Sequence, residues 1–93
     1  MAEIAVRVIV EGRVQGVGYR VWAVQEAWRR NVRGWVRNRR DGGVEALLIG
    51  SERRVEALIE AFRQGPRAAR VTNIVREPAS DDGTPRFYEQ PTV

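Results

Sequence analysis

The chain has 93 residues, of which 43% are hydrophobic and 30% charged, a composition typical of one globular domain rather than of a disordered or fibrous protein. It contains neither Cys nor His, which excludes disulfides, thiol nucleophiles and imidazole bases and removes the commonest zinc ligands. All 16 basic residues are Arg and the formal net charge is +4, so the summed field is expected to attract anions.

The first predicted element is a strand over residues 4–11, because its residues alternate between a strongly apolar face and a mixed face. The apolar face carries Ile4, Val6, Val8 and Val10. Gly12, Gly16 and Gly18 follow within a short stretch, and glycines at this density predict a loop that ends the strand.

A helix is predicted over residues 19–31, because apolar residues recur there at intervals of three or four and Gly34 supplies a stop. The predicted apolar stripe consists of Val21, Val24, Trp28 and Val32. This spacing places Trp28 in the core, and we expect Trp35 to pack there as well from the following strand.

The next strand is predicted over residues 34–40, and the turn Asp41-Gly42-Gly43 should pair it with a strand over residues 44–49. A second helix is predicted to follow Ser51, a suitable N-cap, and to run to about Gln64. Its apolar stripe consists of Val55, Leu58, Ile59 and Phe62.

A fourth strand is predicted over residues 69–77, followed by a polar loop over residues 78–85 and a short strand near Phe87. The order β-α-β-β-α-β predicts an α+β, ferredoxin-like sandwich, in which two helices pack on one face of an antiparallel sheet. The residues after Phe87 alternate poorly and include Pro91, which weakens the prediction of a regular final strand.

Residues 12–20 connect the first strand to the first helix and have the features of an anion-binding loop. Free N–H groups of a loop and of a first helical turn can converge on a phosphate, and glycines allow the backbone to approach it closely. Arg20 would add a charged, bidentate donor. The glycine spacing alone also fits a tight connection followed by a solvated arginine, and neither standard nucleotide-binding motif matches.

Asn38 is the second candidate, because it lies near the end of a predicted strand beside the hairpin turn. Its side-chain amide offers both a donor and an acceptor. Taken alone, Asn38 also fits a residue that stabilises the turn, with Arg37, Arg39 and Arg40 forming a solvated basic edge.

Considered together, residues 12–20 and 34–38, with Asp41-Gly42 downstream, resemble the two signature regions of the acylphosphatase family. The resemblance covers roughly residues 4–77. It implies hydrolysis of the carboxyl-phosphate anhydride bond of acyl phosphates to carboxylate and inorganic phosphate, with no metal and no cofactor. It also implies that Arg20 binds the phosphate and that Asn38 positions the attacking water. The phosphoryl oxygens would be bound by the backbone amides of Gln15, Gly16, Val17, Gly18 and Tyr19.

Two non-catalytic alternatives stay open: an anion-binding carrier or regulator, and an RNA-binding ferredoxin-like module. An RNA-binding module would need exposed aromatic residues on its central strands, and the predicted strands over residues 4–11 and 44–49 contain none. The expected partners are therefore a small-molecule acyl phosphate, and inorganic phosphate or sulfate as product or inhibitor, but not nucleic acid.

Residues 1–93 are expected to form a single acylphosphatase-like domain that is a monomer. No apolar stretch approaches the roughly 20 residues of a membrane span, so no membrane contact is expected. The start of the chain lacks the basic and apolar segments of a signal peptide, which predicts a cytoplasmic location.

Overall fold

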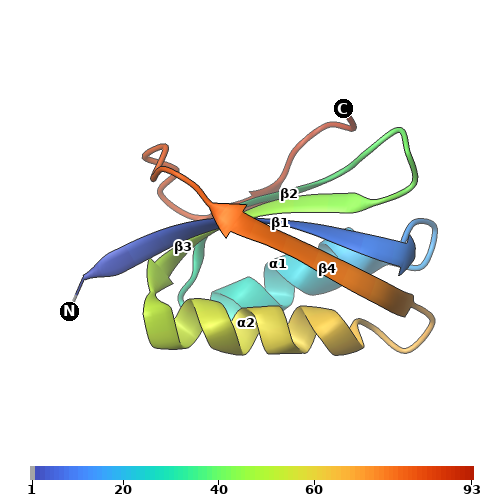
Figure 1. Ribbon diagram of the computed structural model, residues 1–93, viewed down its shortest axis with the longest axis horizontal. Coiled ribbons are helices and arrows are strands. Elements are labelled where there is room, and N and C mark those ends of the chain that lie inside the picture. The colour runs from blue at the N-terminus through green and yellow to red at the C-terminus, as the bar shows by residue number, and fades with distance from the viewer. Residues whose placement is uncertain (1) are drawn as a thin grey trace.

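The computed structural model describes residues 2–93, which form two helices and one five-stranded sheet (Figure 1). The strands are β1 (Glu3–Arg13), β2 (Arg33–Asn38), β3 (Val44–Ser51), β4 (Arg70–Pro78) and β5 (Phe87–Glu89), and the helices are α1 (Tyr19–Arg29) and α2 (Glu52–Gln64). The strand order is β4-β1-β3-β2-β5, and both helices cover the same face of the sheet. The predicted α+β, ferredoxin-like fold is confirmed.

The sheet is mixed, whereas the sequence predicted an antiparallel sheet. The first four strands pair antiparallel, but β5 runs parallel to β2, with Gly34 opposite Phe87 and Val36 opposite Glu89. The reason is topological. Strand β4 ends at the same end of the sheet at which β2 begins, so a chain that crosses to the far edge without doubling back must run parallel to β2.

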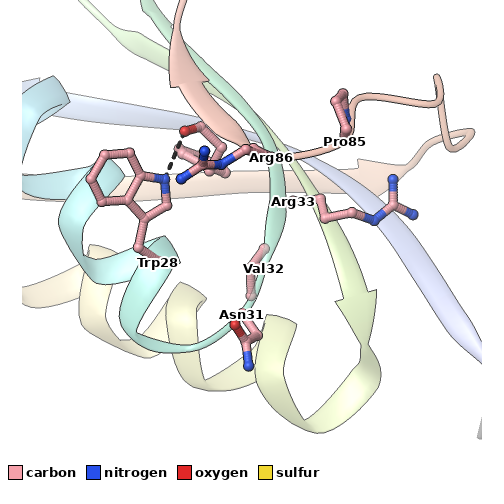
Figure 2. Close-up of a pocket in the computed structure, with 7 residues that line it drawn as sticks. Trp28, Asn31, Val32, Arg33, Pro85 and Arg86 are labelled. Atoms are coloured by element: carbon pink, nitrogen blue, oxygen red, sulfur yellow. Dashed lines mark hydrogen bonds between the residues drawn. The ribbon is translucent and has the colours of Figure 1, made fainter.

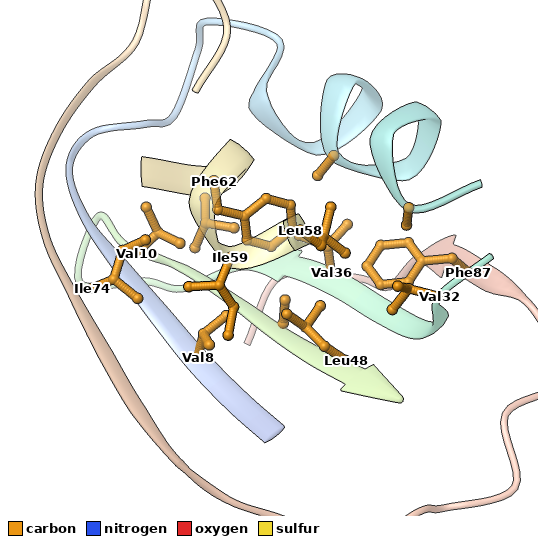
Figure 3. Close-up of a cluster of buried hydrophobic side chains, with 14 of the residues drawn as sticks. Val8, Val10, Val32, Val36, Leu48, Leu58, Ile59, Phe62, Ile74 and Phe87 are labelled. Carbon is orange, nitrogen blue, oxygen red and sulfur yellow. The ribbon is translucent and has the colours of Figure 1, made fainter. Parts of the chain in front are cut away.

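The core fills the space between the helices and the sheet (Figure 3). The predicted apolar face of β1 supplies Val8 and Val10, which are fully buried. The predicted stripe of α2 packs against them, and all four of its residues are buried. The α2 helix also begins as predicted, because the Ser51 side chain accepts a hydrogen bond from the Arg54 amide at 3.3 Å.

The apolar stripe predicted for α1 is only partly confirmed, because Val24 and Val32 are buried but Val21 and Trp28 are not. The buried residues are Tyr19, Ala23, Val24 and Ala27. In contrast, Val21 is 55% exposed and Trp28 is 53% exposed. Alanines allow a helix backbone to lie close to a sheet, so α1 packs against β2 and β5 along a face of small residues that hydrophobic spacing does not reveal.

The predicted core position of Trp28 is therefore wrong. Its indole lies across the end of β5, where Nε1 donates a hydrogen bond to the carbonyl oxygen of Phe87 at 2.9 Å (Figure 2). The Arg86 guanidinium lies 5.8 Å from the ring centroid. An indole combines an apolar ring with an N–H donor, which suits a position at the rim of a core. Trp28 thus joins the end of α1 to β5 and borders a hollow of about 230 Å³.

The predicted core position of Trp35 is wrong as well, because Trp35 lies on the sheet face opposite the helices. Its neighbour Val36 is fully buried on the helix-facing side, and successive residues of a strand point to opposite faces. The Trp35 ring stacks under the Arg37 guanidinium at 4.5 Å, and its Nε1 donates to Asp82 at 3.1 Å.

Tyr19 joins the start of α1 to the end of α2. Its hydroxyl donates a hydrogen bond to the carbonyl oxygen of Phe62 at 2.7 Å, and both residues are buried. In a continuing helix this carbonyl would accept from the amide at position 66, but Pro66 has no N–H group. Burial raises the pKa of Tyr19, so the hydroxyl stays protonated and remains a donor.

We expect Tyr19→Phe to lower the free energy of unfolding by about 1–3 kcal/mol, because the Phe62 carbonyl would stay buried without a donor. Urea unfolding followed by tryptophan fluorescence measures this change. Tyr88→Phe is the control, since Tyr88 is 43% exposed and its hydroxyl accepts only an exposed hydrogen bond from Gln90, so loss of the hydroxyl should change the stability by less than about 0.5 kcal/mol. Equal effects of the two substitutions would contradict the capping role of Tyr19.

Candidate active site

The predicted loop and Asn38 come together at one end of the sheet, beside the start of α1. They line a pocket of about 110 Å³. The lining residues are Val14, Gln15, Gly16, Gly18, Tyr19, Arg20, Val21, Asn38 and Glu89. The pocket therefore brings together all of the predicted site residues except Val17, whose side chain packs against the core.

Strand β1 is longer than predicted and delivers the loop directly to the pocket. It does not end at Gly12 but continues to Arg13, through an irregularity in its pairing with β4 between Glu11 and Gly12. The loop proper is therefore confined to residues 14–18. Both of its ends are joined directly to regular elements, β1 and α1.

The loop leaves its backbone amides free to bind a ligand. Gly16 and Gly18 have φ angles of 71° and 77°, a left-handed conformation that glycine adopts at little cost. The first hydrogen bond of α1 runs from the Trp22 amide to the Gly18 carbonyl at 3.1 Å. Within residues 2–93, no protein group accepts a hydrogen bond from the amides of residues 15–21. Unpaired amides at the positive end of a helix dipole are a well-suited anion site.

The Gln15 side chain fastens this loop to the β2–β3 hairpin. Its Nε2 donates to the carbonyl oxygens of Arg39 at 2.7 Å and of Gly43 at 2.8 Å. Both carbonyls belong to the turn that directly follows Asn38, so the contact sets the distance between the loop and Asn38. The sequence predicted a role only for the Gln15 amide, because no local pattern pairs a side chain with carbonyls 24 and 28 residues away.

The hairpin turn is itself held by Asp41. One carboxylate oxygen accepts a hydrogen bond from the Gly43 amide at 2.9 Å, and the other accepts from Arg39 Nε at 3.0 Å. The Gly43 amide and then the Arg39 guanidinium hold the pKa of Asp41 below its usual value, so the contacts persist at neutral pH. The turn therefore gives Gln15 fixed carbonyl acceptors.

Asn38 reaches the pocket because of its register in β2. It lies two residues after Val36, on the helix-facing side of the sheet, where the first turn of α1 begins. Its carbonyl oxygen accepts a hydrogen bond from the Val93 amide at 3.1 Å. Its half-buried side-chain amide borders the pocket, and among residues 2–93 it makes no protein hydrogen bond. The side chain is therefore free to hold a water molecule or a ligand.

Arg20 is the second residue of α1, and its side chain is 36% exposed at the pocket. Its Nη1 lies 3.7 Å from Oε1 of Glu89, which is too long for a hydrogen bond. Some other arginines are held more tightly; Arg33, for example, lies 2.6 Å from Asp81. The Arg20 guanidinium is thus positioned by a loose ion pair and keeps its N–H donors for a ligand.

Glu89 is the one charged residue of the pocket lining that the sequence did not predict; Val14 and Val21 were not predicted there either. The parallel pairing of β5 places it opposite Val36, and it shares the helix-facing side with the buried Phe87, two residues earlier. The alternation of Phe87, Tyr88 and Glu89 contains part of this signal. Only the pairing of β5 with β2 brings Glu89 to Arg20, and that pairing is not encoded by any local motif.

Known proteins share both the sequence pattern and the fold of this chain. The chain matches the family model described as Acylphosphatase over residues 6–88. An acylphosphatase from Nitrobacter winogradskyi is 46% identical over 99 aligned positions, which cover all of both chains, and one from Alcanivorax borkumensis is 56% identical over 85% of this chain and 87% of its own. The crystal structure of acylphosphatase from Bacillus subtilis has a TM-score of 0.90 at 41% identity, covering 94% of this chain and 98% of that one. The chain belongs to the acylphosphatase family.

Proposed function

We propose that this chain is an acylphosphatase, which hydrolyses the carboxyl-phosphate anhydride bond of acyl phosphates to carboxylate and inorganic phosphate, with residues 1–93 acting as one domain. The observation that carries the proposal is the pocket in which unpaired loop amides, Arg20 and Asn38 meet. A phosphoryl group needs donors on several sides and one positive charge, and this pocket supplies both.

In the proposed complex, the amides of the loop bind the non-bridging oxygens of the phosphoryl group. These amides belong to Gln15, Gly16, Val17, Gly18 and Tyr19. Arg20 donates to the same oxygens from the first turn of α1. Because the donors are oriented before the substrate arrives, they stabilise charge in the transition state without reorganising.

This chemistry requires neither a general acid nor a metal. The leaving group is a carboxylate whose conjugate acid has a pKa of about 4, so the departing oxygen needs no proton. Phosphoryl transfer passes through a loose transition state with charge spread over the oxygens, so positioning and electrostatic stabilisation supply most of the rate. Alkyl phosphates release a strongly basic alkoxide and should be poor substrates.

Asn38 is proposed to orient the attacking water from the opposite side of the pocket. Bond formation to water is limited in a loose transition state, so the water needs to be placed more than activated. As the P–O bond to water forms, the anhydride P–O bond breaks, and the water proton passes to a phosphate oxygen. The products are the carboxylate and inorganic phosphate.

The experiment that tests this function is the hydrolysis of benzoyl phosphate by the purified protein in the presence of EDTA. We expect turnover that EDTA does not reduce. Asn38→Ala should lower kcat by about 10²-fold with little change in the inhibition constant of inorganic phosphate, because the water loses its anchor while the phosphate donors remain. The control is Asn73→Ala on β4, where Asn73 is exposed and bonds Glu11. Absence of hydrolysis, or its loss with EDTA, would contradict the proposal.

A second prediction concerns Gln15. Gln15→Leu should lower kcat/KM about tenfold or more, because the side-chain hydrogen bonds that join the loop to the hairpin carrying Asn38 would be lost. Steady-state kinetics with benzoyl phosphate measures this, with Gln25→Leu, an exposed position of α1, as the control. If Gln15→Leu were as active as the control, the side chain would have no role in placing the loop.

The remaining expectations belong to the same proposal. We propose a cytoplasmic monomer that binds inorganic phosphate or sulfate as product or inhibitor and binds no nucleic acid. In support of the last point, β1 and β3 carry no aromatic residue that could stack a base. Neither helix within residues 2–93 is long and apolar enough to cross a bilayer.

A further inference from the structure

The pocket proposed to bind phosphate contains an acidic side chain. Of the residues that line it, Glu89 alone carries a carboxylate, and this carboxylate faces the guanidinium that should bind the substrate. The Glu89 side chain is 39% exposed, so it lies at the mouth of the pocket rather than beneath the loop. Any anion that contacts Arg20 from the pocket therefore lies close to a second negative charge.

The backbone of Glu89 is held by hydrogen bonds before and after it along the chain, although β5 is an edge strand that pairs with β2 alone. The Gln90 amide donates to the Val36 carbonyl at 2.9 Å, and the Trp28 indole donates to the Phe87 carbonyl at 2.9 Å. The side chain can rotate, but the backbone keeps it at the rim of the pocket. The charge is thus a fixed feature of the site.

The pocket is too small to enclose a whole substrate. Its volume of about 110 Å³ is well below the roughly 300–1,000 Å³ of pockets that enclose drug-sized ligands. The acyl group must then extend out of the pocket, whose lining includes the exposed side chains of Val21 and Glu89. Val21 is 55% exposed and offers an apolar contact, whereas Glu89 offers a negative charge.

The phosphoryl group is the same in every acyl phosphate, so its repulsion by Glu89 does not distinguish one substrate from another. The acyl group differs. A neutral alkyl or aryl group would contact Val21, while a group that ends in a carboxylate would bring a further negative charge to Glu89. We propose that Glu89 is a specificity-determining residue, which selects neutral acyl groups and disfavours anionic ones. This inference rests on the function proposed above.

Two substrates of equal length test the selection. Butyryl phosphate and succinyl phosphate both have four-carbon acyl groups and differ in the terminal group, methyl in one and carboxylate in the other. We expect Glu89→Gln to raise kcat/KM for succinyl phosphate by about three- to tenfold relative to butyryl phosphate. The substitution removes the repulsion between the Glu89 carboxylate and the terminal carboxylate of the succinyl group, which solvent screens in part. The ratio of the two constants cancels any change in folding or in Arg20 that affects both substrates equally.

Matched variants separate the local charge from other causes. Glu89→Asp keeps the charge and should keep the wild-type ratio within about twofold. Glu60→Gln removes the same charge from an exposed position on α2 and should leave the ratio unchanged, which excludes an effect of net charge. An unchanged ratio in Glu89→Gln, or an equal loss on both substrates, would overturn the inference. Failure of the proposed function itself would look different, because the wild-type protein would then hydrolyse neither substrate.

Discussion

Arg20→Ala is expected to lower kcat/KM for benzoyl phosphate by about 10²- to 10³-fold, the usual cost of removing one preorganised donor from an oxyanion-type site. The expectation rests on the geometry of the pocket as well as on the resemblance to the family. Arg20 is the basic residue that lines the pocket of loop amides, and its loose ion pair with Glu89 leaves its N–H groups free. Steady-state kinetics with purified variants measures the loss.

Two further variants show whether charge alone explains the effect. Arg20→Lys keeps the positive charge but loses the planar fork, so it should recover only part of the activity. Arg63→Ala removes an exposed arginine of α2 and should leave kcat/KM unchanged. If Arg20→Ala kept more than about a tenth of the wild-type kcat/KM, the guanidinium would not be a principal phosphate ligand.

The largest effect on stability is expected from Glu45→Ala, which should lower the free energy of unfolding by about 2–4 kcal/mol. Glu45 is 2% exposed on the sheet face opposite the helices, where it bonds Arg37 Nε at 2.9 Å and also bonds Arg7. Removing one partner of a buried ion pair typically costs about 3–5 kcal/mol. The lower figure expected here reflects the partial exposure of Arg7 and Arg37, whose charges water can solvate after Glu45 is removed. Urea unfolding measures the change.

The pH dependence of this effect has a definite sign. Burial raises the pKa of Glu45, but the hydrogen bonds from Arg37 and Arg7 outweigh it and hold the pKa below its usual value of 4.5. The ionised carboxylate therefore stabilises the fold above that value, and its contribution is lost as the pH falls through the lowered pKa. The stability difference between wild type and Glu45→Ala should be constant near neutrality and shrink at acidic pH.

Glu60→Ala is the control for Glu45→Ala, because the Glu60 side chain is 74% exposed in its pair with Arg63. It should lower the stability by less than about 1 kcal/mol. A similar small effect for Glu45→Ala, or a difference that grows in acid, would contradict the role assigned to the buried carboxylate.

The sequence predicted most of the fold because the signals for most elements are local. The alternation along β1 and the stripe of α2 each report a face that packs on the core, and the structure confirms both. The face of α1 was predicted only in part, because Val24 is buried as expected but Ala23 and Ala27 are too small to stand out in a hydrophobic pattern. The parallel pairing of β5 depends on where β4 ends, which no window of the sequence contains.

The candidate site was likewise predicted only in part from the sequence. The loop and Asn38 became candidates through the glycine spacing and the position of Asn38 beside the hairpin turn, each of which also fitted a structural role. The resemblance to two family motifs then assigned their functions. The Gln15 side chain and Glu89 were not found, because their partners lie 24 or more residues away and are brought near by the folding of the sheet. Local pattern therefore located the site, while tertiary structure supplied the residues that position and surround it.

The central claim is that an anion is held between the free amides of the loop and the guanidinium of Arg20. Two-dimensional ¹H–¹⁵N spectra recorded during titration with inorganic phosphate test it most directly. We expect saturable shifts concentrated at the amides of residues 15–20, and a large loss of affinity in Arg20→Ala. Shifts confined to the basic edge at residues 37–40, with the loop amides unmoved, would contradict the account.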